Sequence, residues 1–285
     1  MNINETSGII NTGGRPSLAG VGAVAALVVL SGVAAAAGLW KVLAIAWVAF
    51  AAMAGAAPLG AAGTDAEAHG LVWGYGLASG AMITSAAVFL VPQAVGFDPQ
   101  VGGFGVAAGL LVGFGSHVVG HRLVHVDESF DDTAAQLTAH SLSAGAIIGL
   151  VYGALPELGL LLGLAIVSHK GPAGYAAARR LARAGKPASV LLLPAAGVGI
   201  AAVPTALLPV PNVPAVNAAV FGFAAGMFLH VAMDFLPRCE VGGEVGEVAD
   251  LSPDAHDLLD RLRLHAVAST TVGGVAVFLA WWLIA

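Results

Sequence analysis

The sequence is poor in charged side chains and has a single cysteine. Asp, Glu, Lys and Arg make up only 10% of its residues, whereas a soluble globular domain carries about 25%. Cys239 has no second cysteine with which to form a disulfide or a cysteine zinc site. The few basic residues form no stripe with interleaved aromatic residues, which argues against a nucleic-acid interface. Residues 1–17 are polar and do not form a signal peptide's basic region followed by a cleavable apolar core.

Long apolar runs dominate what remains, since 58% of the residues are hydrophobic. A helix that spans a bilayer needs about 20 mainly apolar residues. The runs are continuous and rich in Ala, Leu and Gly, which favours helices over the alternating strands of a membrane barrel. The sequence therefore predicts an all-α fold, a polytopic membrane helix bundle of about nine transmembrane helices. The predicted spans are 17–37, 40–62, 70–94, 103–124, 135–154, 158–180, 187–208, 215–236 and 265–284.

Basic residues in a short loop predict the orientation of these spans. Lys and Arg near the ends of spans favour the cytoplasmic side, and Arg179, Arg180, Arg183 and Lys186 lie together. With nine spans, this places the N-terminus in the cytoplasm and the C-terminus outside the cell membrane, with cytoplasmic loops near 121–134 and 237–264. The lipid bilayer is the first expected partner. The abundant small residues also allow a homodimer, because they let helices approach closely in lipid.

Two predicted neighbouring spans carry polar residues that need a reason to be in lipid. His140 begins the segment His140-Ser141-Leu142-Ser143, in which Ser141 and Ser143 are further oxygen donors. His169 and Lys170 lie in the middle of the next span, just before Pro172. A proline inside a span removes a backbone hydrogen bond, so we expect a kink beside His169.

Imidazoles beside a kinked backbone predict a cation site between these spans. Imidazole suits zinc, copper, iron or nickel, while calcium and magnesium prefer several carboxylates. A simple hydrogen bond between the His140 and His169 helices is the alternative interpretation.

Two further groups recur at a spacing of four residues, which places their members on one helical face. His117, His121 and His125 run out of the fourth span toward an acidic segment. They either collect or release metal at the cytoplasmic mouth or form an ordinary solvated helix end. His230 and Asp234, in the eighth span, either pair with each other or line the pathway.

Several of these segments resemble the Zrt/Irt-like (ZIP) family of divalent metal transporters. Residues 76–93, GLASGAMITSAAVFLVPQ, look like the family's second helix, and residues 221–237, FGFAAGMFLHVAMDFLP, are similar to its seventh. The His140 segment matches the fourth-helix pattern, and residues 169–174 match the HNIPEG-type pattern of the fifth at His, Pro and Gly.

The resemblance implies a ZIP-like eight-helix core at 39–285, preceded by an N-terminal tail and one extra transmembrane helix at 1–38. It also implies a permease, not an enzyme, that moves zinc or a similar divalent metal ion toward the cytoplasm. The ion is then the transported substrate, and no cofactor is obligatory. Under this reading His140, Ser141, Ser143, His169, His230 and Asp234 contribute to the metal pathway.

The chain departs from the family where the metal-binding acids are expected. Ala144 stands where an acid follows the fourth-helix His, Ala173 replaces the Glu of the fifth helix, and Gln93 replaces the Glu that ends the second. Lys170 then serves as a charge surrogate, its ammonium standing where a second cation would sit. The alternative is a ZIP-like protein with lost or changed metal transport that carries another solute or none. An intramembrane metalloenzyme would need a motif such as HExxH, which the sequence lacks.

Overall fold

The computed structural model describes residues 17–62, 68–124, 132–240 and 255–283. The described chain is 89% helical and contains no strand, which agrees with the predicted all-α class. The helices are α1 Leu18–Ala36, α2 Trp40–Ala61, α3 Ala68–Ser85, the π-helix η1 Ala86–Leu90, α4 Val91–Phe97, α5 Pro99–Val124, α6 Asp132–Ala154, α7 Leu160–Val167, α8 Lys170–Arg183, the 3₁₀ helix η2 Ala188–Leu191, α9 Leu192–Ala206, α10 Pro214–Glu240 and α12 Ala255–Trp282.

Seven helical segments of the described chain are long and apolar enough to cross a membrane. They fit a multi-pass membrane bundle, but they do not confirm the predicted count of nine. The predicted span 103–124 lies in α5, where Pro99–Gly115 is an apolar helical stretch of the fully described residues. The predicted span 158–180 is divided between α7 and α8. The seven segments are Leu18–Ala36, Trp40–Ala61, His69–Phe97, Thr133–Ala154, Ala188–Ala206, Pro214–Leu236 and Asp257–Trp282.

The break between α7 and α8 replaces the kink expected beside His169. The helix ends at Val167, turns through Ser168 and His169, and starts again at Lys170. Pro172 is the third residue of α8. Backbone amides in the first turn of a helix make no hydrogen bond within the helix, so a proline there costs none. The proline thus fits the first turn of a new helix, which sets His169 at the discontinuity.

Helices extend into both predicted cytoplasmic loops, which are therefore shorter than expected. α10 continues to Glu240, and α12 begins at Ala255, ten residues before the predicted start of the last span. The first turns of α12 are polar: Arg263 Nη1 lies 2.7 Å from Asp260 Oδ1, and Asp257 stands in the first turn, where the helix dipole favours an acid. The prediction of a span at 265–284 left these turns out, because it was based on an apolar run and a helix outside lipid does not need one.

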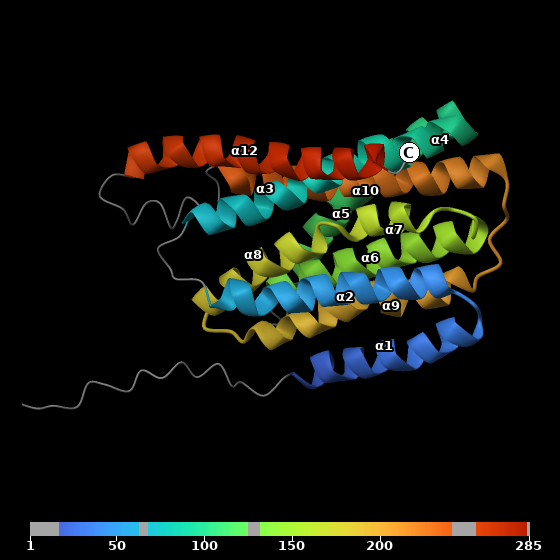
Figure 1. Ribbon diagram of the computed structural model, residues 1–285, viewed down its shortest axis with the longest axis horizontal. Coiled ribbons are helices and arrows are strands. Elements are labelled where there is room, and N and C mark those ends of the chain that lie inside the picture. Colours follow the sequence, from blue (N-terminus) through green and yellow to red (C-terminus); the bar gives the residue numbers. More distant parts are fainter. Residues whose placement is uncertain (1–16, 63–67, 125–131, 241–254, 284–285) are drawn as a thin grey trace, which may run out of the picture.

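The bundle consists of two groups of helices that run along a common long axis (Figure 1). In one group α5 packs on α10, and α12 packs on α3. In the other, α2 packs on α8, and α9 packs on both α6 and α1. Contacts between the groups are sparser and run mainly from α3 to α8 and from α10 to α6. The residues around the α7–α8 break therefore face the seam between the groups.

Glycines bring the paired helices into backbone contact. A Cβ at Gly80 of α3 would overlap the carbonyl of Thr270 on α12. A Cβ at Gly149 of α6 would overlap the carbonyl of Ala202 on α9. Such close approach is how helices associate in lipid, where burial of apolar surface gives no advantage over contact with lipid tails.

Large apolar side chains cover the outside of the bundle, as expected of a surface that faces lipid. Leu18 is 92% exposed, Phe104 75% and Leu264 72%, on three different helices. Soluble monomers rarely expose large contiguous apolar patches. Together with the seven apolar helices, this surface fits a protein embedded in a membrane.

Lys41 at the start of α2 closes the connection between α6 and α7. Its Nζ donates to the carbonyls of Pro156 at 2.7 Å and Leu158 at 2.8 Å. We expect Lys41→Met to lower the free energy of unfolding by about 1.5–3 kcal/mol, the range for hydrogen bonds made by a charged group, and to speed hydrogen exchange at the Leu158 amide. Lys41→Arg keeps a donor and should behave like the unaltered protein. Unchanged exchange in Lys41→Met would show that this contact does not hold the connection.

Candidate functional site

His140 and His169 meet across the interface of α6 with the α7–α8 break. Their Nε2 atoms are 3.0 Å apart, and the ring planes are tilted by 55° with centroids 5.2 Å apart. A hydrogen bond between two ring nitrogens needs a proton on one and a lone pair on the other. At least one imidazole is therefore neutral and holds a lone pair directed at its partner, which is the state in which imidazole binds a metal.

Ser141 and Lys170, the next residue on each side, form a second bridge between the same helices. Lys170 Nζ donates to Ser141 Oγ over 3.0 Å. Lys170 is 1% exposed and Ser141 is fully buried. An ammonium in such surroundings is costly unless it is hydrogen-bonded, and this serine is the partner that the structure provides. The two bridges are consecutive, so the four side chains form one compact polar cluster.

Aromatic and backbone groups enclose the buried His169 ring. Phe228 of α10 meets it edge to face, with centroids 5.6 Å apart and an angle of 88° between the planes, and is itself 1% exposed. His169 Nδ1 is buried without a completed hydrogen bond, although the Ile166 carbonyl lies next to the ring. A histidine that binds a metal through Nε2 usually donates from Nδ1 to a carbonyl or carboxylate, a bond that His169 Nδ1 does not complete here.

The structure brings together four of the predicted site residues and leaves Ser143 out. Ser143 Oγ donates to the carbonyl of Ala139 on its own helix, at 2.9 Å. A hydroxyl engaged one turn back along the helix is not directed at the imidazole pair. Ser143 thus offers a matched serine for comparison with Ser141.

His230 and Asp234 of α10 contact each other and lie near the cluster. His230 Nε2 is 3.6 Å from Asp234 Oδ2, and the His230 ring packs on Gly113 of α5, where any larger residue would collide with it. His230 also interacts electrostatically with His140. This geometry shows the paired arrangement, and a role along a pathway stays a prediction.

The predicted face of three histidines lies mostly beyond the structural description. His117 and His121 belong to the last turns of α5, of which only the backbone is described, and His125 lies outside the described residues. Their proposed role at a cytoplasmic mouth therefore stays a prediction.

Carboxylates are missing from the cluster, as the sequence indicated. Ala144 and Ala173, each one turn beyond its histidine, are buried. Among the described residues, nowhere do three or more His, Cys, Asp or Glu side chains gather as metal ligands. The cluster thus offers two imidazoles and one hydroxyl, all uncharged donors, beside a lysine nitrogen.

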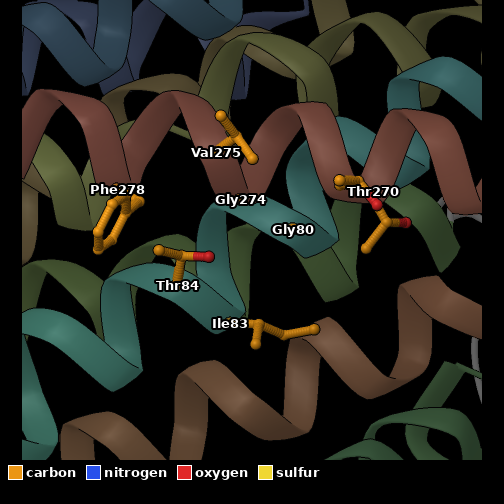
Figure 2. A pocket seen from close by; sticks show the side chains of 8 residues that line it. Gly80, Ile83, Thr84, Thr270, Gly274, Val275 and Phe278 are labelled. Carbon is orange, nitrogen blue, oxygen red and sulfur yellow. The ribbon is translucent and has the colours of Figure 1, made fainter.

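A groove of about 360 Å³ lies elsewhere, between α3 and α12 (Figure 2). Its polar groups are threonines, among them Thr84 and Thr270, and its walls include Ile83, Val275 and Phe278. None of the predicted site residues lines this groove, so its shape says nothing about the imidazole pair.

Fold and surface together define the class of the protein, which is that of helical multi-pass membrane proteins. No known family model matches the chain, and comparison with curated proteins finds none of significantly similar sequence.

Two neighbours of the cluster could not be found from the sequence. Phe228 is one apolar residue among many in α10, and nothing around it marks its contact with His169. Ile166 contributes a backbone carbonyl, which every residue has. The sequence signal was confined to polar side chains in an apolar run, which are rare enough to stand out.

Proposed function

We propose that this chain is a membrane permease for metal ions that bind imidazole, with its site at the His140–His169 pair. The observation that carries the proposal is the 3.0 Å separation of the two Nε2 atoms at a helix break inside the bundle. Nitrogens of two ligands on one ion, each about 2.0–2.1 Å from the metal as in zinc sites, are separated by little more than this. Zinc or a similar divalent ion is the cargo that the resemblance to ZIP transporters implies.

The position of the cluster also supports transport. Its residues come from α6 and the α7–α8 break, and Phe228 of α10, in the other group of helices, covers His169. Irregular backbone at membrane depth is tolerated only inside protein or along an aqueous path, and broken helices are typical of transporter sites. Moderate affinity suits this role, because a carrier must release its cargo as well as capture it.

A changed cargo is the second candidate, and Lys170 favours it. Its nitrogen lies on Ser141, beside the imidazoles, and Ala144 and Ala173 supply no compensating charge. A divalent ion there would lack the anions that usually accompany it. A ZIP-like protein with this site would carry another solute or none.

Uptake into sealed vesicles tests the proposal directly. The purified chain is reconstituted into proteoliposomes that contain a metal-sensitive dye, and zinc, cobalt, nickel or reduced copper is added outside. We expect saturable entry of at least one ion, above that into protein-free liposomes. Absence of entry for every ion under an inward gradient would contradict the metal permease. It would leave the alternative, a ZIP-like protein that carries another solute or none.

We also propose that the basic end of α8 is cytoplasmic, which makes the connection from α6 to α7 external. In a Cys239→Ser background, Lys186→Cys should resist a membrane-impermeant maleimide on intact cells, whereas Glu157→Cys should react. Both positions are exposed in the structure, so protection reports the side of the membrane. Permeabilised cells supply the control, since both cysteines should then react. The opposite pattern on intact cells would invert the orientation.

A further inference from the structure

We infer that the His140–His169 pair selects a soft monovalent cation of the copper(I) class over a divalent ion. The inference rests on the proposed function, because it names the ion carried by the same site. Two independent features of the cluster lead to it: the absence of negative charge and the direction in which the two lone pairs point.

The lack of negative charge in the cluster disfavours divalent ions more than monovalent ones. The free energy of burying an ion grows with the square of its charge, so a divalent ion costs roughly four times as much as a monovalent ion of equal size. Carboxylates normally offset that cost, but Ala144 and Ala173 hold the positions one turn from the histidines. Lys170, whether charged or neutral, adds no negative charge. Neutral imidazoles alone therefore favour the ion of lower charge.

The direction of the ring nitrogens favours an ion with two ligands in line. In the pair, one Nε2–H points at the Nε2 lone pair of the other ring. An ion that replaces this proton meets two donors from opposite sides. The nitrogens must then move apart from 3.0 Å to about 4 Å, twice a metal–nitrogen distance of about 2 Å. Copper(I) and silver(I) are stable with two nitrogen ligands opposed in this way. Zinc requires four ligands in a tetrahedron, so it would need two more.

The surroundings of the pair supply few further ligands among the described residues. Ser141 Oγ already accepts a hydrogen bond from Lys170, and no third His, Cys, Asp or Glu side chain joins the pair there to form a metal-binding group. Phe228 covers His169 with an apolar ring edge, which limits the water that could complete a zinc shell. Low coordination and low charge thus point to the same ion.

Silver(I) is the probe, because it shares the charge and geometry of copper(I) and undergoes no redox change during the assay. Proteoliposomes containing the full chain are given silver nitrate or zinc nitrate in chloride-free buffer, washed, and analysed for metal by mass spectrometry. We expect silver to accumulate and zinc uptake to be lower by about tenfold or more. Copper held as copper(I) by ascorbate should follow silver. His140→Ala should abolish silver uptake, and Ser143→Ala should not.

The outcomes separate this inference from the proposed function. If zinc uptake equals silver uptake and both are lost in His140→Ala, the selectivity is wrong but the proposed permease is still supported. No uptake of either ion would overturn the permease and the inference with it. Silver uptake that survives in His140→Ala would place the path elsewhere and overturn the inference.

Restoring a carboxylate tests the charge argument separately. Ala173→Glu should raise the ratio of zinc to silver uptake about tenfold or more. Lys170→Leu should raise it in the same direction, because it removes a buried amine beside the imidazoles and adds no soft ligand. Size-exclusion chromatography in detergent identifies which variants are folded. Because Lys170→Leu introduces no buried charge, it remains informative if Ala173→Glu does not fold. An unchanged ratio in a folded variant would overturn the charge argument.

Discussion

Replacing His169 with alanine is expected to lower metal uptake by about tenfold or more, a loss at least as large as that on removing an outer-shell partner of a metal ligand. His169 supplies one of only two imidazoles, and its Nε2 lies 3.0 Å from that of His140. With a single neutral nitrogen left, the site cannot hold an ion between two donors. The measurement is the initial rate of silver and zinc entry into proteoliposomes with matched protein content.

Ser143→Ala is the matched control for this experiment. Ser143 lies three residues after His140, but its hydroxyl is engaged with the Ala139 carbonyl. Its removal should leave the rate close to that of the unaltered protein. Ser141→Ala is different, because it removes the acceptor of Lys170 and leaves a buried donor unsatisfied, so the rate should fall. If His169→Ala and Ser143→Ala had the same rate, the cluster would not be the transport site.

Replacing Gly149 with alanine should destabilise the bundle by about 1–3 kcal/mol, the usual range for overpacking. A Cβ there would overlap the Ala202 carbonyl and the Thr205 hydroxyl of α9 and would lie 2.9 Å from the Ala206 amide nitrogen. These are mainly backbone atoms, which cannot rotate away, so α6 and α9 would have to separate. The measurement is the unfolding temperature in detergent, which should fall.

Gly55→Ala provides the matched comparison on α2. No atom lies within 4 Å of a Cβ built at Gly55, and alanine is a better helix former than glycine by about 1 kcal/mol. This variant should therefore unfold at the same temperature or a higher one. A fall in Gly55→Ala as large as that in Gly149→Ala would mean that the α6–α9 contact is not what makes Gly149 necessary.

Apolar run length carried most of the fold prediction. It located six of the seven long apolar helices to within a few residues and placed the start of the seventh, α12, ten residues too late, at 265 rather than Ala255. It failed where a helix is polar. The first turns of α12 look like a loop, because hydropathy reports contact with lipid and not backbone hydrogen bonding. It also joined α7 and α8 into one span, because a few polar residues inside a long apolar segment do not show that the helix breaks at Ser168 and His169.

The candidate site was predictable in its members but not in its pairing. His140, Ser141, His169 and Lys170 stood out because polar residues inside apolar runs are rare. Which nitrogen faces which partner could not be derived, since the rotation of each helix about its axis depends on packing against all its neighbours. Ser143 shows the limit: three residues from His140, it nevertheless bonds to its own helix.

The sequence by itself determined that the chain is helical and apolar, that its polar interior groups are few, and that acids are missing beside the two histidines. These properties depend only on which residues the chain contains and on their order in the sequence. Tertiary structure decided that the helix breaks at His169, that Phe228 covers the ring, and that Lys170 lies on Ser141. Those contacts join segments distant in the chain, and their geometry is set by how closely the glycine-rich helices pack.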